Sequence, residues 1–89
     1  MPYAVITGAT QGIGKAIADK FLSQGFDIAI CARSSADLDK VKNEWAAKYP
    51  SRKVLAVAAD LSDKAACFDF AAQVLKDTTT IDALINNAG

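Results

Sequence analysis

The first sign of chemistry in this 89-residue chain is a glycine-rich run between an apolar segment and a helix-like one. A helix N-terminus offers free N–H groups and the positive end of the helix dipole, so it attracts phosphate. Gly8 can turn the chain out of the strand, Gly12 lets the backbone approach a phosphate, and Gly14 lets the helix pack close to the sheet. We therefore predict diphosphate contacts, rather than a plain strand–helix turn, from the following residues: Gly8, Thr10, Gln11, Gly12, Ile13 and Gly14.

A second candidate binding site lies just beyond the next apolar run, residues 28–32. An acidic residue about 20 residues after the last glycine would bind the ribose hydroxyls of NAD. This sequence has Arg33 there, so no carboxylate repels a 2′-phosphate, and a guanidinium can hold it with paired, charge-assisted bonds. Ser34 can add a hydroxyl. The pattern predicts NADP(H) in preference to NAD(H); the alternative is that Arg33 is a solvated loop charge.

Polar segments also follow the third and fourth apolar runs. The Asp60 carboxylate can accept a hydrogen bond from an adenine amino group while the Leu61 backbone approaches the ring. The alternative is an acidic residue that begins a helix and interacts with its dipole. Amides in the segment after the fourth run can bond the ribose of a cofactor or tie strand ends together, and on their own they indicate a turn. The predicted cofactor contacts in this segment are Asn87, Ala88 and Gly89.

These residues need a sheet and helices to position them, and the hydrophobic pattern predicts both. We expect strands over residues 3–7, 27–32, 53–59 and 82–86, with a helix in each interval. Continuous apolar runs are typical of parallel strands that are buried on both faces. Their alternation with helices predicts a doubly wound α/β sheet, a partial Rossmann fold with strand order 3-2-1-4. Right-handed crossovers then place the first two helices on one face and the third on the other.

The helix limits have signals of their own. The first helix is predicted over residues 13–23, with Gly25 as its stop. Ser34 and Asp37 form a capping-box pattern for the second helix, which Pro50 ends. Ser62 is predicted to cap the third helix. The apolar residues expected along the second and third helices are Leu38, Val41, Trp45, Phe68, Ala71, Val74 and Leu75.

Charge and composition narrow the classes of partner. Ten basic residues balance ten acidic ones, so we expect neither nucleic acid nor an anionic membrane as a partner. No segment has the pattern of a signal peptide or a membrane span, which makes the cytoplasm the expected location. Histidine is absent, which removes the commonest metal ligand and general base, and we predict no metal site. Cys31 and Cys67 fall in apolar runs and are expected to be small buried residues.

Together these residues resemble the short-chain dehydrogenase/reductase family, in its branch with the T-G-x-x-x-G-x-G loop. The resemblance covers the whole chain and rests on Thr7 with the glycine-rich run, on Asp60-Leu61 and on Asn86–Gly89. It implies a homo-oligomeric, NADP-dependent oxidoreductase that transfers hydride between NADPH and a small-molecule carbonyl or alcohol, such as a 3-oxoacyl-type or general carbonyl reductase. Many NADP-preferring members also carry a basic residue where this sequence has Gln11, and Lys15 lies on the helix beyond it.

No catalytic residue is predicted within these residues. The family's serine and Tyr-x-x-x-Lys pair lie downstream of the N-N-A-G motif, where this sequence ends. Tyr49 and Lys53 have the spacing, but Pro50 interrupts the helix that the pair would need. We therefore expect residues 1–89 to be the N-terminal dinucleotide-binding part of a single Rossmann domain and to be inactive alone. We also expect them to self-associate through the edge of the fourth strand and an incompletely covered sheet face.

Two other classes of protein remain. One is a non-enzymatic nucleotide-binding or regulatory module, which a reading frame that continues into a serine and a Tyr-x-x-x-Lys would exclude. The other is a sugar-nucleotide epimerase or an atypical family member. Those relatives favour G-x-x-G-x-x-G, and the spacing of Gly8, Gly12 and Gly14 argues against them.

Overall fold

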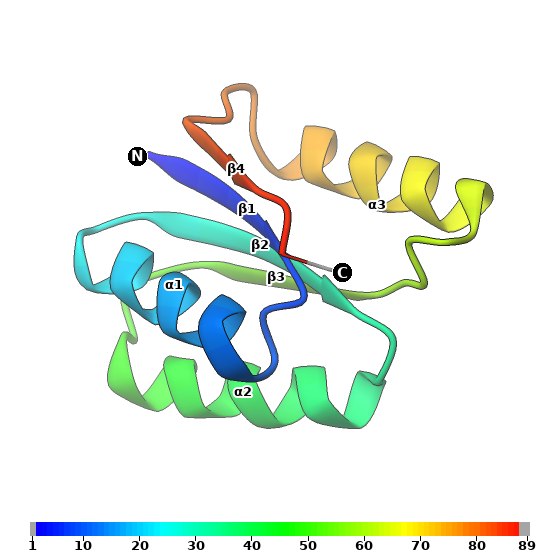
Figure 1. The fold of residues 1–89 in the computed structure, drawn as a ribbon. Coiled ribbons are helices and arrows are strands. Elements are labelled where there is room, and N and C mark those ends of the chain that lie inside the picture. Colours follow the sequence, from blue (N-terminus) through cyan, green and yellow to red (C-terminus); the bar gives the residue numbers. More distant parts are fainter. Residues whose placement is uncertain (1, 88–89) are drawn as a thin grey trace.

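Four strands and three helices make up residues 2–87, the part of the chain that the computed structural model describes (Figure 1). The strands are β1 (Tyr3–Thr7), β2 (Asp27–Ala32), β3 (Val54–Ala58) and β4 (Ala83–Ile85), and the helices are α1 (Gly12–Ser23), α2 (Ser35–Lys48) and α3 (Lys64–Asp77). The sheet order is β3-β2-β1-β4 and every neighbouring pair is parallel. The predicted partial Rossmann topology is therefore confirmed.

The sequence-based limits of β3 and β4 are one residue too wide at both ends. At β4 the difference has a clear cause, because the flanking side chains bind β1. The Asp82 carboxylate accepts a hydrogen bond from the Tyr3 N–H group at 2.8 Å, and the Asn86 amide oxygen accepts one from the Thr7 hydroxyl at 3.1 Å. The short strand β4 is thus anchored to β1 by a polar side chain at each end.

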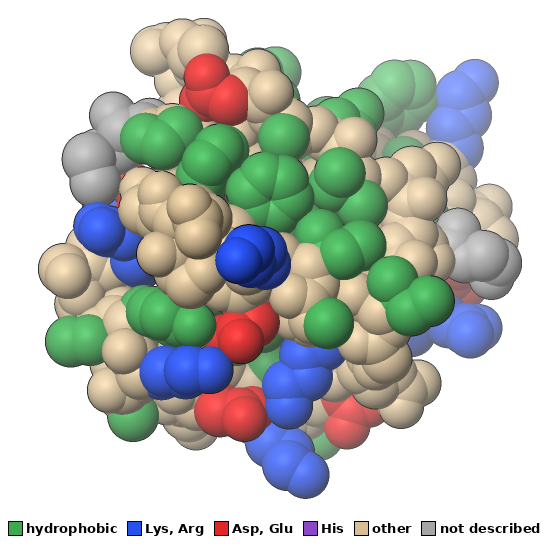
Figure 2. Space-filling view, turned by 60° about the vertical axis from the view of Figure 1, so that its left-hand side comes forward, with side chains coloured by type: hydrophobic (Ala, Val, Ile, Leu, Met, Phe, Trp, Pro, Cys, Tyr) green, Lys and Arg blue, Asp and Glu red, His purple; other side chains and the backbone are tan. Residues whose placement is uncertain are grey.

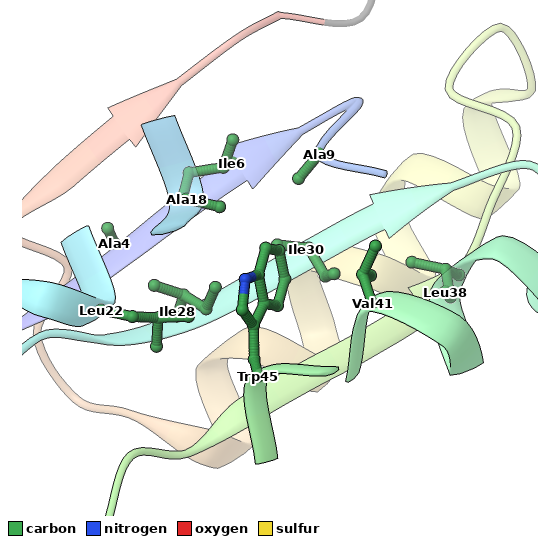
Figure 3. Close-up of a cluster of buried hydrophobic side chains, with 10 residues drawn as sticks. All are labelled: Ala4, Ile6, Ala9, Ala18, Leu22, Ile28, Ile30, Leu38, Val41 and Trp45. Atoms are coloured by element: carbon green, nitrogen blue, oxygen red, sulfur yellow. The ribbon is translucent and has the colours of Figure 1, made fainter. Parts of the chain in front are cut away.

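Helices α1 and α2 cover one face of the sheet (Figure 1). Between them and the strands lies a cluster of buried apolar side chains, in which Trp45 of α2 is the largest (Figure 3). The members of the cluster are Ala4, Ile6, Ala9, Ala18, Leu22, Ile28, Ile30, Leu38, Val41 and Trp45. The apolar face predicted for the second helix, which includes Leu38, Val41 and Trp45, is therefore confirmed.

Helix α3 covers the opposite face, so the predicted placement of the three helices is also confirmed (Figure 1). The apolar residues predicted along α3 differ in their exposure to solvent. Val74 is buried, but Phe68 and Leu75 are 65% and 67% exposed, and Phe70 is the other buried side chain. Because Phe70 and Val74 are four residues apart, they share the helix face that meets the sheet, and Phe68 and Leu75 do not lie on it.

The end of α1 forms where the sequence predicts it. The Gly25 N–H group donates to the Leu22 carbonyl and the Phe26 N–H group to the Phe21 carbonyl, both at 3.1 Å. Gly25 has a φ of 91°, the left-handed conformation that this type of helix end requires. The rings of Phe21 and Phe26 meet edge to face across the turn at 4.8 Å.

The predicted N-cap is correct for α2 and wrong for α3. The Ser34 hydroxyl caps α2 as predicted and accepts the Asp37 N–H group at 3.2 Å. Ser62 does not cap α3. The cap is Asp63, whose carboxylate accepts the Ala65 N–H group at 3.1 Å. The Ser62 hydroxyl instead donates to the Asp60 carboxylate at 2.7 Å.

The described residues carry two further findings on membrane and metal chemistry. No helix within residues 2–87 has the length and apolar character to cross a membrane, and no group of three or more His, Cys, Asp or Glu side chains there is placed to hold a metal ion. Both cysteines are free thiols. Cys31 is buried as expected, and burial raises the pKa of its thiol. Cys67 is only partly buried, and its thiol donates to the Leu61 carbonyl at 3.1 Å.

Candidate functional site

The glycine-rich loop joins the carboxyl end of β1 to α1. Gly8 and Gly12 have φ values of 64° and 62°, conformations that favour glycine, and a methyl group at Gly12 would meet no heavy atom within 4 Å. Gln11, the N-cap residue of α1, makes no side-chain hydrogen bond to the helix, and the first turn has no acidic residue. The first N–H groups of α1 therefore lack a capping side chain, whereas Ser34 and Asp63 cap α2 and α3.

Gly14 brings α1 close to the loop that precedes it. An added Cβ would overlap the carbonyl oxygen of Gly8 and the side-chain nitrogen of Asn87. The close approach predicted at this glycine is present, and it fixes where α1 begins relative to the end of β1. Of the other predicted loop contacts, Thr10 is half-buried, and Gln11 and Ile13 are exposed.

Thr7, the last residue of β1, connects this loop to the segment after β4. Its hydroxyl donates to the Asn86 amide oxygen at 3.1 Å and accepts the Asn87 N–H group at 2.8 Å. The Asn87 side chain in turn donates to the Gly8 carbonyl at 3.3 Å. Within residues 2–87 the asparagines therefore tie strand ends together, which is one of the two roles that the sequence suggests for them. Ala88 and Gly89 lie outside the described residues.

Thr7 is not among the predicted cofactor contacts, although it organises the loop. Its signal in the sequence is a hydroxyl at the end of an otherwise apolar, fully buried strand, directly before Gly8. A buried hydroxyl needs a hydrogen-bond partner, and the nearest candidates lie on neighbouring strands. Which strand supplies the partner depends on the sheet order, so the contact follows only from the fold.

Arg33 and Asp60 meet at the same edge of the sheet, beside the glycine-rich loop. The Gly8 N–H group donates to the Cys31 carbonyl at 3.1 Å, which joins the loop to the carboxyl end of β2. Arg33 follows β2 and Asp60 follows β3, and the last residues of these strands are register partners. Both side chains are exposed. The fold thus brings together two of the predicted sites that lie far apart in the sequence.

The Asp60 carboxylate is held by the turn that it begins. One of its oxygens, Oδ1, accepts the Ser62 N–H group at 3.0 Å and the Ser62 hydroxyl at 2.7 Å. These hydrogen bonds hold the pKa of Asp60 below its usual value, and the positive charge of Arg33 acts in the same direction. Because Asp63 caps α3, Asp60 does not fill the helix-starting role that was its alternative.

Ser34 and Leu61 complete the predicted set. The Ser34 hydroxyl accepts the cap bond of α2, which leaves its own proton free to be donated. Leu61 packs partly against the core beneath α3, and its carbonyl accepts the Cys67 thiol. Both residues therefore belong to turns that the fold holds in place.

The sequence raised two further candidates, Lys15 and the Tyr49–Lys53 spacing, and the structure places both. Lys15 forms an ion pair with Glu44 of α2 at 2.9 Å, so it is not a ready substitute for the basic residue that Gln11 replaces. Tyr49 follows the end of α2, and Lys53 lies beyond it, before β3. These two residues do not share a helix face, which the Tyr-x-x-x-Lys chemistry would need.

Two surface depressions lie along the helices, and only Gly12 of the predicted site residues lines one of them. A furrow of about 230 Å³ runs between α1 and α2 and is lined by both partners of the Lys15–Glu44 ion pair, with Gly12 at one end. The charged side chains that line this furrow already form ion pairs with one another. The chemistry-bearing residues instead surround the carboxyl ends of the strands, which is where open α/β sheets bind their ligands.

Comparison with known proteins gives consistent matches. The family model of the short chain dehydrogenases matches residues 2–89. The NADPH-dependent reductase BacG of Bacillus subtilis (strain 168) is 37% identical over 84 residues, which are 94% of this chain and 32% of the relative. The very-long-chain 3-oxooacyl-coA reductase let-767 of Caenorhabditis briggsae is 38% identical over 87 residues, which are 98% of this chain and 28% of the relative.

A solved structure agrees with the fold as well as the sequence. The L-sorbose reductase of Gluconobacter frateurii, complexed with NADPH and L-sorbose, is 34% identical and superimposes with a TM-score of 0.93. The match covers 99% of this chain and 33% of that one. The chain therefore spans about a third of the length of the proteins it matches.

Proposed function

Because this chain belongs to the short-chain dehydrogenase/reductase family, we propose that it is the NADP(H)-binding part of an enzyme that transfers hydride between NADPH and a carbonyl or alcohol. Residues 1–89 are then the N-terminal dinucleotide-binding part of a single Rossmann domain. The observation that carries the proposal is an exposed Arg33 guanidinium at the same edge of the sheet as an α1 N-terminus without a capping side chain. A guanidinium and free N–H groups suit two separate phosphates of one ligand.

We propose contacts in this chain for four parts of the dinucleotide. The diphosphate would contact Gly8, Gly12 and the start of α1, where the backbone is open to a ligand. The 2′-phosphate would contact Arg33, with Ser34 adding a hydroxyl. The adenine would lie against Asp60 and Leu61. The ribose contacts proposed for the last segment are Asn87, Ala88 and Gly89.

Bound NADPH supplies the hydride, and the residues of this chain bind and orient it. The groups that would move a proton on the substrate are assigned to sequence outside these 89 residues. Two of the relatives are named as reductases of a sugar and of a 3-oxoacyl-CoA, which supports a small-molecule carbonyl substrate of the 3-oxoacyl or general type.

Isothermal titration of the full chain with NADPH and with NADH tests the cofactor proposal. We expect NADPH to bind at least about tenfold more tightly, because a single charged hydrogen bond of about 1.5–3 kcal/mol has that effect. Equal affinities, or no binding, would contradict it. The same chain should not oxidise NADPH in the presence of carbonyl compounds, and turnover would contradict the assignment of catalysis to other sequence.

We also propose that the chain self-associates, as its family does, and that it works in the cytoplasm, where its two free thiols stay reduced. The edge of β4 carries Leu84, which is 68% exposed, and hydrophobic side chains gather on the side of the molecule seen in Figure 2. Light scattering should show a species larger than the 9.4 kDa monomer. Leu84→Lys should favour the monomer, whereas Leu75→Lys, equally exposed on α3, should not.

A further inference from the structure

Arg33 and Asp60 carry opposite charges on neighbouring strands, yet they do not form an ion pair. Ala32 and Ala58 are register partners, and the Ala59 N–H group donates to the Ala32 carbonyl at 2.9 Å, so β2 and β3 stay paired up to these two residues. In the described part of the chain, the ion pairs join α1 to α2 and leave both residues out. Arg33 still acts on the Asp60 carboxylate through space, although the two charged groups make no direct contact.

Ser62 is the residue that holds the Asp60 carboxylate. Both its N–H group and its hydroxyl donate to Oδ1 of Asp60, the hydroxyl at the shorter distance of 2.7 Å. The Asp63 N–H group also donates to the Asp60 carbonyl at 2.9 Å, which closes the turn. Oδ2 of Asp60 makes no hydrogen bond with residues 2–87 and remains available to an adenine amino group.

We propose that Ser62 is a positioning residue for cofactor choice: it holds the Asp60 carboxylate within its own turn and so leaves the Arg33 guanidinium available to a 2′-phosphate. The inference rests on the proposed function, because it assumes that Arg33 binds this phosphate. It adds to that function a residue that touches neither the phosphate nor the guanidinium and acts through Asp60.

The physical basis is a competition between two anions for one cation. A carboxylate that loses the Ser62 hydroxyl bond is held by the backbone N–H group alone and can turn toward Arg33 more easily, and a 2′-phosphate must then displace it. Exposed ion pairs shift such equilibria by about three- to fivefold. The Ser62 hydroxyl forms a charge-assisted hydrogen bond with Asp60 that opposes the rotation of the carboxylate toward Arg33. NADH carries no 2′-phosphate, so its affinity does not depend on whether Arg33 is available.

The test is the ratio of NADPH to NADH affinity, measured by titration of the full chain and its variants. Ser62→Ala removes the hydroxyl and should lower the ratio about three- to fivefold, through weaker NADPH binding. Ser62→Thr keeps a hydroxyl and should restore the ratio. In an Asp60→Asn background, Ser62→Ala should leave the ratio unchanged, because the competing charge is gone.

Each result separates this inference from the proposed function. If Ser62→Ala weakens NADPH and NADH by the same factor, Ser62 only stabilises the turn, and the inference fails. A ratio that still falls in the Asp60→Asn background would also overturn it. If the unaltered chain binds neither cofactor, the proposed function fails and this inference with it. A preference for NADPH that depends on Arg33 but not on Ser62 would leave the proposed function standing alone.

Discussion

Tyr3 at the amino end of β1 and Arg33 beyond the carboxyl end of β2 are both polar residues at strand ends, but only Tyr3 is bound within the fold. Its N–H group donates to Asp82 at 2.8 Å and its hydroxyl to Asp77 at 2.7 Å, while only 3% of the residue is exposed. Burial, together with Asp77, raises the pKa of the Tyr3 hydroxyl. Arg33 is exposed and makes no hydrogen bond with the described residues.

The same contrast extends to the carboxylates at the two ends of the sheet. Asp27, at the amino end of β2, is buried and accepts the Lys53 N–H group at 2.8 Å. Asp60, at the carboxyl end, is exposed and keeps one oxygen without a partner in the fold. A buried polar group costs free energy unless it is hydrogen-bonded, so the amino end must use its polar groups internally. The carboxyl end retains free hydrogen-bonding capacity, which is what a ligand needs.

The largest expected effect is that of Gly14→Ala, which disturbs the packing of α1 against the loop at the carboxyl end of β1. The added Cβ would overlap the Gly8 carbonyl and the Asn87 side chain, so α1 must shift. We expect the free energy of unfolding in urea to fall by about 3 kcal/mol, at the upper end for overpacking. NADPH affinity should fall as well, because the loop that would hold the diphosphate moves with the helix.

Gly12→Ala is the matched control for that variant. Its methyl group would enter open space, and only the left-handed φ of 62° is unfavourable. The loss of stability should be about 1 kcal/mol. If Gly14→Ala lowers the free energy of unfolding no more than Gly12→Ala does, the close contact between α1 and the Gly8 carbonyl contributes nothing to stability.

Arg33→Ala separates ligand binding from folding, because an exposed side chain contributes little to the stability of the fold. The affinity for NADPH should fall by about 1.5–3 kcal/mol, the loss of a charged hydrogen bond, while that for NADH stays nearly unchanged. The free energy of unfolding should change by less than about 0.5 kcal/mol, as for other exposed side chains. Lys40→Ala, which removes one exposed positive charge from α2, is the control for net charge. Equal losses for both cofactors would contradict a 2′-phosphate role for Arg33.

The sequence predicts most of the fold because its local and long-range signals agree. The apolar runs of β1 and β2 are long and bounded, so their limits are predicted to the residue. Gly25 and Ser34 each form hydrogen bonds with residues three positions away in the sequence. These local bonds set the end of α1 and the start of α2. Position in the sheet then follows from crossover handedness, which does not depend on individual side chains.

What escapes prediction is the choice between neighbouring residues of similar type. Ser62 and Asp63 are both good N-caps, but the structure places Asp63 at the start of α3 and the Ser62 hydroxyl against Asp60. Phe68 and Phe70 are both apolar, and only the rotation of α3 against the sheet selects Phe70 for burial. These choices depend on contacts between segments, which a single helix or turn pattern does not contain.

Tyr3→Phe tests the amino end by removing one buried hydrogen bond. The free energy of unfolding in urea should fall by about 1 kcal/mol, because the Asp77 carboxylate loses its donor while the ring stays in place. The affinities for NADPH and NADH should not change. A change in either affinity would mean that the two ends of the sheet are coupled, and that the division between fold and ligand binding is not as clean as the hydrogen bonds indicate.

The smallest expected effect is the acid dependence that Asp60 adds to stability. Its folded-state pKa is lowered, chiefly by the Ser62 hydrogen bonds, so the folded state favours the ionised carboxylate. This contribution is fully present above the unfolded-state pKa of about 3.9 and is lost as the pH falls through the lower folded value. Asp60→Asn should therefore reduce the decline of the urea midpoint as the pH falls below about 5. Asp39→Asn, on an exposed face of α2, should follow the unaltered chain. If Asp60→Asn declines as steeply as the unaltered chain, Ser62 does not hold the carboxylate in solution, and Asp60 is as free as Arg33.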